Sequence, residues 1–157
     1  MNDIGNIIGT LCKIILPIPE ESYIGNNSSS IAICTLSSID LLKNIANSEI
    51  LNHIYIVGRL FSENKGIDSI IKYVNKNKNI KTIIVCGKEV WGHKAGHSLF
   101  ALHKNGIDDK GKIIGSTSPE PLLGVTQDEI HYFQKEVVLV DMINETNIEA
   151  IKQKIIS

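Results

Sequence analysis

The strongest constraint on the fold is a regular alternation between short, continuous apolar runs and stretches in which apolar residues recur at helical spacing. The apolar runs have the length of buried strands and fall at residues 31–36, 53–57, 81–86, 112–115 and 137–141. The helical stretches lie near residues 41–46, 67–74, 98–104, 129–133 and 148–155. Strands that are apolar on both faces are typical of a covered parallel sheet. The pattern therefore predicts an α/β fold, a Rossmann-like three-layer sandwich with a mostly parallel sheet, in which residues 1–157 form a single domain.

Composition and charge exclude several classes of protein. Of the 157 residues, 43% are hydrophobic and 21% are charged, which is close to globular averages and excludes disordered and fibrous chains. The net charge of −1 argues against a nucleic-acid partner, because such a partner requires a basic face. No apolar run approaches the roughly 20 residues needed to cross a bilayer. We recognise no signal peptide and expect a cytoplasmic protein with no membrane span.

The three cysteines offer no sign of a metal cluster. Cys12, Cys34 and Cys86 are far apart in the sequence and lack CxxC spacing, and two of them lie within apolar runs. We interpret them as buried, reduced thiols and expect neither a zinc site nor an iron–sulfur site on them.

The densest cluster of chemically useful residues follows the third apolar run. In parallel α/β folds, ligands bind outside the carboxyl ends of the strands, so the loop that follows this run is a candidate site. Residues 87–98 hold three glycines, two histidines and the only tryptophan of the chain. Residues 87–96 of this stretch are called the glycine loop below. Its spacing matches neither the dinucleotide fingerprint GxGxxG nor the phosphate loop GxxxxGK[ST].

The two histidines of this stretch, His93 and His97, are four residues apart. On a helix they would share a face and could share a metal, but a zinc site needs a third ligand and the motif HExxH is absent. Three interpretations stay open from the spacing alone: a metal-binding pair, a role for one histidine only, or no special role.

His93 and Gly96 also form the pattern HxxG, the second half of the D-x-H-x-x-G signature of cobalamin carriers. In that signature the histidine binds cobalt in place of the cofactor's own base, and the aspartate orients the imidazole. Trp91 stands at the aspartate position here. Glu89 is the candidate carboxylate that would replace it.

Several segments together resemble the A subunit of tetrahydromethanopterin S-methyltransferase, the corrinoid-carrying component of a sodium-pumping complex of methanogens. Between residues 87 and 106, the matching pattern contains Gly87, Glu89, Gly92–His93, Gly96 and Ser98–Leu99. The resemblance also covers residues 23–36, the Glu63–Asn64-x-Gly66–Ile67 segment, residues 113–121 and residues 133–141. It therefore extends over most of the chain, from about Tyr23 to Asp141.

The resemblance implies a function and a site. The family's subunit carries a cobalamin-type corrinoid, whose cobalt accepts a methyl group from methyl-tetrahydromethanopterin and passes it to coenzyme M. By position, His93 would be the axial ligand of cobalt, and no catalytic residue is assigned. We expect a methyltransferase subunit that works with other subunits, and cofactor-binding residues in three segments that converge on one pocket: Asn64, Gly66, Gly87, Glu89, Gly92, His93, Gly96, Gly115, Ser116 and Pro121.

The sequence departs from the family at several positions. His97 stands where relatives carry glutamine, residues 58–61 replace G-P-C-K, and residues 114–119 replace I-G-A-K-G-A. The transmembrane helix that ends the family's membrane-complex members is not found, which favours a soluble homologue or an isolated cytoplasmic domain. The alternative function is a soluble paralogue that acts as a small-ligand or interaction module without methyl transfer.

Overall fold

The structure is a computed structural model, and it describes residues 22–157. Cys12 and the expectation of no signal peptide lie outside the described residues. The elements in chain order are β1 (Ser22–Ile24), β2 (Ile31–Cys34), α2 (Ile39–Ala46), the short 3₁₀ helix η1 (Glu49–His53), β3 (Ile56–Gly58), α3 (Lys65–Lys76), β4 (Thr82–Gly87), α4 (Ala95–Asn105), α5 (Gln127–Glu136), β5 (Val138–Ile143) and α6 (Ile148–Ile156).

The described strands form one five-stranded sheet in the order β1-β3-β2-β4-β5. Strands β3, β2, β4 and β5 are parallel, and β1 pairs antiparallel with β3 at the edge. One row across the four parallel strands consists of branched apolar residues: Val57, Ile33, Ile84 and Val140. This confirms the prediction of an α/β fold with a mostly parallel sheet.

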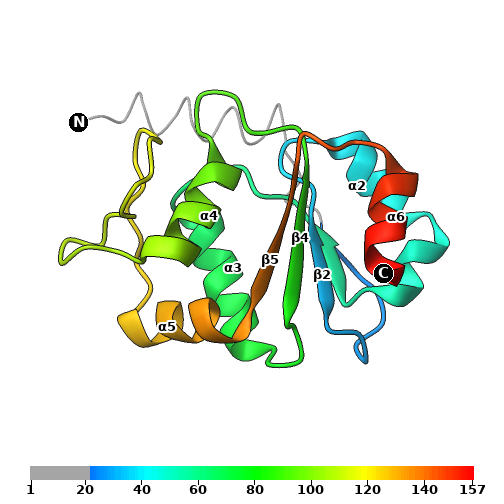
Figure 1. The fold of residues 1–157 in the computed structure, drawn as a ribbon, viewed down its shortest axis with the longest axis horizontal. Helices are drawn as coiled ribbons and strands as arrows, with labels where there is room; N and C mark the ends of the chain where they lie inside the picture. The colour runs from blue at the N-terminus through cyan, green and yellow to red at the C-terminus, as the bar shows by residue number, and fades with distance from the viewer. Residues whose placement is uncertain (1–21) are drawn as a thin grey trace, which may run out of the picture.

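Helices cover both faces of the sheet, which gives the three layers that the sequence predicts. Figure 1 shows α3, α4 and α5 on one side of the strands and α2 and α6 on the other. Each side has its own apolar core. The larger core joins the sheet to α3, α4 and α5 and contains Phe133, and the smaller one joins it to α2, η1 and α6 around Ile45.

Three predicted strands are confirmed to within a few residues, those at 31–36, 81–86 and 137–141. The strand predicted at residues 53–57 needs correction. Residues 49–53 form the 3₁₀ helix η1, and the strand begins at Ile56. Ser48 caps η1, because its side chain accepts a hydrogen bond from the backbone N–H of Ile50. Ile54 precedes this strand, and its side chain is buried in the smaller core although the residue belongs to no strand.

The predicted strand at residues 112–115 is wrong. Within the described chain, this segment makes only isolated bridges, from Ile107 to Ile113 and from Lys112 to Leu122. Gly111 and Gly115, which flank the apolar residues, both have φ of +83°, and this left-handed conformation interrupts an extended strand. The segment follows α4 and packs in the helical layer, where Ile113 belongs to the larger core.

The five predicted helices are all present, with ends that local capping sets. α4 begins at Ala95, three residues before the predicted start. α5 begins with a capping box, in which the Thr126 side chain accepts from Glu129 N and the Glu129 carboxylate accepts from Thr126 N. Among the described helices, none is long and apolar enough to cross a membrane.

Candidate functional site at the carboxyl ends of the strands

The parallel strands β2, β3 and β4 end at the same edge of the sheet, and the loops that follow them contact one another there. Ser37, which follows β2, donates its backbone N–H to the carbonyl of Lys88, which follows β4, at 3.1 Å. Arg59, which follows β3, donates from its guanidinium to the carbonyl of Ser37 at 3.0 Å. The sheet topology therefore brings together loops that are far apart in the sequence.

Two glycines of the glycine loop adopt a left-handed backbone conformation, but they differ in how closely other atoms pack against them. Gly87 has φ of +76°, and a Cβ there would clash with the carbonyl oxygen of Thr35. Gly92 has φ of +78° but has nothing within 4 Å of an added Cβ. Gly87 is therefore needed for close packing against the β2 loop, whereas Gly92 only serves the turn before His93.

The central contact of the site joins His93 to a buried carboxylate. Nδ1 of His93 lies 3.0 Å from Oε2 of Glu63, which follows β3. The Glu63 side chain is only 2% exposed, whereas that of His93 is 57% exposed. An ionised carboxylate can only accept a hydrogen bond, so the neutral imidazole carries its proton on Nδ1. In this tautomer the lone pair is on Nε2, the nitrogen that Glu63 does not contact.

Glu63 is held in place from a second direction. Its Oε1 accepts a hydrogen bond from the backbone N–H of Glu120 at 3.0 Å. Burial raises the pKa of the Glu63 carboxyl, but its own backbone N–H, that of Glu120 and the His93 imidazole together bring the pKa below the ordinary value. The carboxylate is therefore ionised at neutral pH and fixed between two loops.

The three segments that we expect to converge are in contact. Besides Glu63, the amide of Asn64 donates to the carbonyl of Glu120 at 3.3 Å, so the 63–66 and 115–121 segments are linked twice. The glycine loop joins them through His93 and through Lys94, whose carbonyl accepts from the Ser118 hydroxyl at 3.3 Å.

A buried group of hydroxyls continues this connection below the glycine loop. Ser98 lies in α4 and is fully buried. Its Oγ lies 2.7 Å from Oγ of Ser116 and 2.5 Å from Oγ of Ser118. The predicted site residue Ser116 thus binds to α4, and the three hydroxyls fix residues 116–118 against the start of that helix.

Glu89 has a different place from the one that the sequence suggests. Its carboxylate accepts hydrogen bonds from the backbone N–H groups of Gly96 at 3.0 Å and His97 at 2.8 Å. These are N–H groups of the first turn of α4, which have no partner within the helix. Glu89 therefore caps α4, and Glu63 is the carboxylate that contacts His93.

The remaining predicted site residues shape the backbone around this contact. An added Cβ on Gly96 would lie 2.9 Å from Oε2 of Glu89, and on Gly66 it would lie 2.7 Å from Cδ1 of Leu60. Gly115 has φ of +83°, and the carbonyl of Pro121 accepts from the backbone N–H of Ile113 at 2.8 Å.

Trp91 and His93 in the glycine loop, and His97 in the first turn of α4, are all exposed. Trp91 is 95% exposed, the largest exposure among the large apolar residues of the described chain. His97 is exposed, and its backbone N–H is held by Glu89. Within residues 22–157, no group of three or more His, Cys, Asp or Glu residues is arranged to hold a metal ion.

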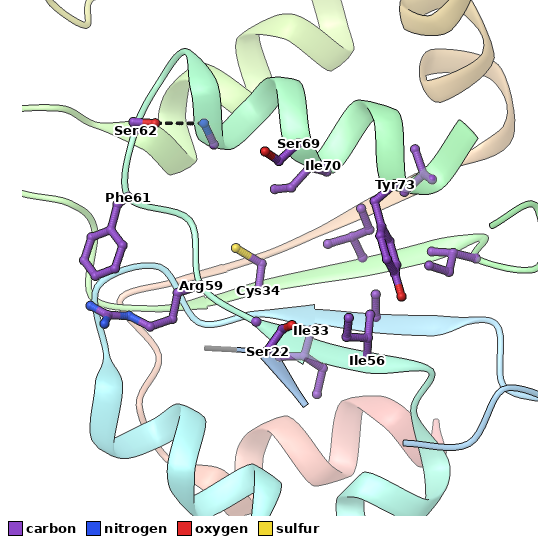
Figure 2. A pocket seen from close by; sticks show the side chains of 16 residues that line it. Ser22, Ile33, Cys34, Ile56, Arg59, Phe61, Ser62, Ser69, Ile70 and Tyr73 are labelled. Atoms are coloured by element: carbon purple, nitrogen blue, oxygen red, sulfur yellow. Dashed lines mark hydrogen bonds between the residues drawn. The ribbon is translucent and has the colours of Figure 1, made fainter. Parts of the chain in front are cut away.

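A groove lies beside the site, but it does not join the three segments. It has a volume of about 280 Å³ and runs between α3 and strands β2 and β3 (Figure 2). Gly66 is the one predicted site residue among those that line it. The expectation that all three segments open into one pocket is therefore not met by this groove, which we call the α3 groove.

Sequence reasoning missed the pairing of His93 with Glu63. Glu63 belongs to a segment that the family resemblance singles out, but the sequence alone favours Glu89, which is nearer to His93 along the chain. The available signal is topological: Glu63 follows β3 and the glycine loop follows β4, and parallel strands place both loops at one edge.

The fold and the site together define an α/β protein in which a buried carboxylate contacts an exposed histidine at the carboxyl edge of the sheet. Comparison with known proteins defines the family. The family described as tetrahydromethanopterin S-methyltransferase, A subunit, matches residues 16–157. The chain belongs to this family.

Relatives in methanogens agree with this assignment. The chain is 42% identical over 138 residues to a putative Mtx methyltransferase A subunit of Methanosarcina barkeri, in an alignment that covers 86% of this chain and 66% of that protein. It is 38% identical over 142 residues to tetrahydromethanopterin S-methyltransferase A subunit 1 of Methanothermobacter thermautotrophicus, covering 88% of this chain and 58% of that protein. The sequence therefore spans less than two thirds of the length of these two relatives.

A third relative is covered more completely. It is tetrahydromethanopterin S-methyltransferase A subunit 2 of Methanothermobacter marburgensis, to which the chain is 34% identical over 148 residues. That alignment covers 88% of this chain and 77% of the relative. The family and these relatives show that the chain is a homologue of methyltransferase subunits.

Proposed function

We propose that this protein is a corrinoid carrier, in which Nε2 of His93 is the axial ligand of cobalt. The single observation that carries the proposal is the His93–Glu63 contact, because it engages Nδ1 and leaves Nε2 for a ligand on a side chain that is 57% exposed. This histidine lies in the Gly92–His93-x-x-Gly96 segment that resembles the cobalt-binding segment of the family. As in the family, the methyl donor would be methyl-tetrahydromethanopterin and the acceptor coenzyme M, with other subunits as partners in the cytoplasm.

The residues present fit a corrinoid better than a bare metal ion. A corrin ring supplies four nitrogen ligands of its own, so the protein needs to provide only one. His93 is a single exposed imidazole, and the described residues around it contain no cluster of three potential ligands. Gly92 is exposed and has nothing within 4 Å of an added Cβ, so a broad ligand can approach the backbone before His93.

The protein's contribution to the reaction is to bind and orient. When bound, the cobalt centre supplies the methyl-transfer chemistry, and the chain supplies the ligand, its orientation and access to it. In the neutral ring, the hydrogen bond from Nδ1–H of His93 to Glu63 selects the tautomer whose lone pair is on Nε2. The same carboxylate accepts a hydrogen bond from Glu120 N and so connects His93 to the 115–121 segment. Displacement of the imidazole would therefore change a contact that holds this segment.

The exposed Trp91 lies two residues from His93 and has 95% of its surface accessible. An indole in such a position provides a flat apolar surface for a large ligand or for a partner subunit that approaches it. We assign it to the rim of the corrinoid site. The Cys34 and Cys86 thiols are buried and take no part in the proposed function.

The test is reconstitution of the purified chain with hydroxocobalamin, followed by the visible absorption spectrum of the gel-filtered complex. We expect the wild-type protein to retain the cofactor with a histidine-ligated spectrum. His93→Ala should lose that spectrum without loss of the fold, because the side chain is more than half exposed. His97→Gln is the matched control and should behave as wild type.

Two outcomes would count against the proposal. A chain that retains no cofactor would favour the second candidate, a small-ligand or interaction module without methyl transfer. Equal losses from His93→Ala and His97→Gln would indicate that the two histidines act as a pair.

A further inference from the structure

The 115–121 segment is tied to both sides of the His93–Glu63 contact. On one side, the Ser118 hydroxyl donates to the carbonyl of Lys94, the residue that follows His93, at 3.3 Å. On the other side, the backbone N–H of Glu120 donates to Oε1 of Glu63 at 3.0 Å. Because Oε2 of Glu63 contacts Nδ1 of His93, these contacts form a closed circuit, called the His93 circuit below. Its members are His93, Lys94, Ser118, Pro119, Glu120 and Glu63.

The part of the circuit between Ser118 and Glu120 is short and stiff. Pro119 joins the two residues, and its pyrrolidine fixes its own φ. A proline also restricts the backbone of the residue before it, which is Ser118 here. The carbonyl of Glu120 is held as well, because it accepts a hydrogen bond from the Asn64 amide at 3.3 Å. A displacement of Ser118 is therefore transmitted to the N–H group that holds Glu63.

The hydroxyl contacts of Ser118 have one possible direction. Ser118 is 8% exposed, and its Oγ lies 2.5 Å from Oγ of Ser98, which is fully buried in α4. A carbonyl can only accept, so the hydroxyl proton of Ser118 is used at Lys94 and Ser98 must donate to Ser118. Ser98 in turn accepts from Ser116 at 2.7 Å. Ser118 is therefore held by α4 while it donates to the turn that carries His93.

That turn has a backbone conformation that a residue with a side chain disfavours. Lys94 has φ of +47° and ψ of +49°, in the left-handed region. Its N–H donates to the carbonyl of Val90 at 2.8 Å, and its own carbonyl also accepts from Ser98 N at 3.0 Å. The Ser118 hydroxyl adds a contact from outside the glycine loop and α4. The turn is thus held from a third segment of the chain.

We infer that Ser118 is a positioning residue for His93. It holds the Lys94 carbonyl directly, and it holds the Glu63 carboxylate through Pro119 and Glu120. In this way it sets the distance between Nδ1 of His93 and Oε2 of Glu63, the contact that selects the tautomer with the lone pair on Nε2. The importance of this tautomer for cobalt rests on the proposed function, whereas the positioning is testable in the chain without corrinoid.

The test is nitrogen NMR of the full chain without corrinoid, with histidine labelled by the heavier nitrogen isotope. At about pH 8.5, above the ordinary titration range of imidazole, the shifts of the two ring nitrogens report which of them carries the proton. The His93 signals are those that are missing from His93→Gln. We expect the Nδ1–H form in wild type and a mixture of both tautomers in Ser118→Ala. Ser118→Thr keeps the hydroxyl and should restore the Nδ1–H form.

Asn105→Ala is the matched control. The Asn105 amide also holds this part of the chain to α4, through the carbonyl of Ile114 at 2.9 Å, but it lies outside the His93 circuit. Its loss should lower the thermal midpoint and leave the tautomer of His93 unchanged. Pro119→Gly covers the case in which Ser118→Ala disturbs the fold. Pro119 is exposed, and glycine there loosens the circuit, so this variant should also give a mixture of tautomers.

The inference is overturned if Ser118→Ala folds and keeps the wild-type tautomer, or, where it does not fold, if Pro119→Gly keeps it. A shift in Asn105→Ala as large as that in Ser118→Ala would also overturn it, since any loosening of the segment would then suffice. Wild type without the Nδ1–H form would do the same.

Binding of hydroxocobalamin is a separate measurement. Ser118→Ala should bind it about fivefold more weakly than wild type, the usual effect of one neutral hydrogen bond. A chain that shows the expected tautomers but retains no hydroxocobalamin would contradict the proposed function and support the positioning. An unchanged tautomer in Ser118→Ala, with the cofactor bound through His93 in wild type, would contradict the positioning alone.

Discussion

The carboxylate of Glu63 lies 3.0 Å from Nδ1 of His93, although thirty residues separate them in the sequence. The contact joins the loop after β3 to the loop after β4, and the backbone N–H of Glu120 joins the same carboxylate to a third segment. A histidine that binds a metal through one ring nitrogen commonly donates a hydrogen bond from its other ring N–H to such a carboxylate. This hydrogen bond sets the tautomer and the orientation of the ring. Within residues 22–157, the contact is not part of a group of three or more His, Cys, Asp or Glu residues that could hold a metal ion.

The first prediction concerns Glu63→Gln. The amide has nearly the shape of the carboxylate, but it lacks the charge and can offer an N–H to Nδ1 of His93. We expect the affinity for hydroxocobalamin to fall by roughly 10- to 100-fold, the usual effect of removing such a partner. Equilibrium dialysis of the variant beside wild type measures it. Glu89→Gln is the control: it should affect the thermal stability of the chain more than its cofactor affinity, because Glu89 caps α4.

A second prediction separates the two glycines of the glycine loop. Gly87→Ala should lower the free energy of unfolding by about 2 kcal/mol or more, because a Cβ at left-handed φ would also clash with the carbonyl of Thr35. Gly92→Ala should cost less, about 1 kcal/mol, since only the left-handed conformation opposes it. Urea denaturation of both variants gives the comparison. If both variants lose the same free energy of unfolding, the close packing of Gly87 against the β2 loop contributes nothing to stability.

The third prediction follows from the buried thiols. Burial raises the pKa of Cys34 to about 12 and raises that of Cys86 as well, so both thiols are protonated at pH 8. In a Cys12→Ser variant, iodoacetamide at pH 8 should therefore label the native protein far more slowly than the unfolded protein in guanidinium. For each thiol the folded state holds its proton more tightly than the unfolded one. The resulting stabilisation is complete below the unfolded pKa of about 9 and is lost as the pH rises toward the folded value.

Mass spectrometry of the labelled chain measures the third prediction. Rapid labelling of Cys34 or Cys86 in the native protein would contradict the burial that the structure gives them. Labelling in guanidinium, where both sites must react, is the control for reagent activity.

Much of the fold is predictable from local pattern, and the failures have physical causes. The strands around Ile33 and Ile84 are apolar on both faces because helices cover both sides of the sheet, and this leaves a clear signal. The short run at 112–115 has the same composition, but it packs in the helical layer instead of the sheet, which composition does not reveal. β1 is a three-residue edge strand that only its pairing with β3 defines.

The site is predictable in its segments and not in its contacts. Motif and resemblance identify the histidine and the glycine loop, and the structure brings the three expected segments together. The sequence does not show that Glu89 accepts hydrogen bonds from the first turn of α4. Without that information, it does not identify Glu63 as the carboxylate that contacts His93. The α3 groove leaves no local pattern, because its lining comes from several strands, a loop and a helix.

The most direct test of the central claim is electron paramagnetic resonance of the reconstituted protein in the Co(II) state, with histidine labelled by the heavier nitrogen isotope. The nuclear spin of the axial nitrogen splits the cobalt lines, into triplets for ordinary nitrogen and into doublets for the heavier isotope. If His93 binds cobalt through Nε2, the labelled wild type and labelled His97→Gln will give doublets, and His93→Ala will lose them. Triplets in the labelled wild type would mean that the axial nitrogen comes from the cofactor's own base, which would contradict the assignment of His93.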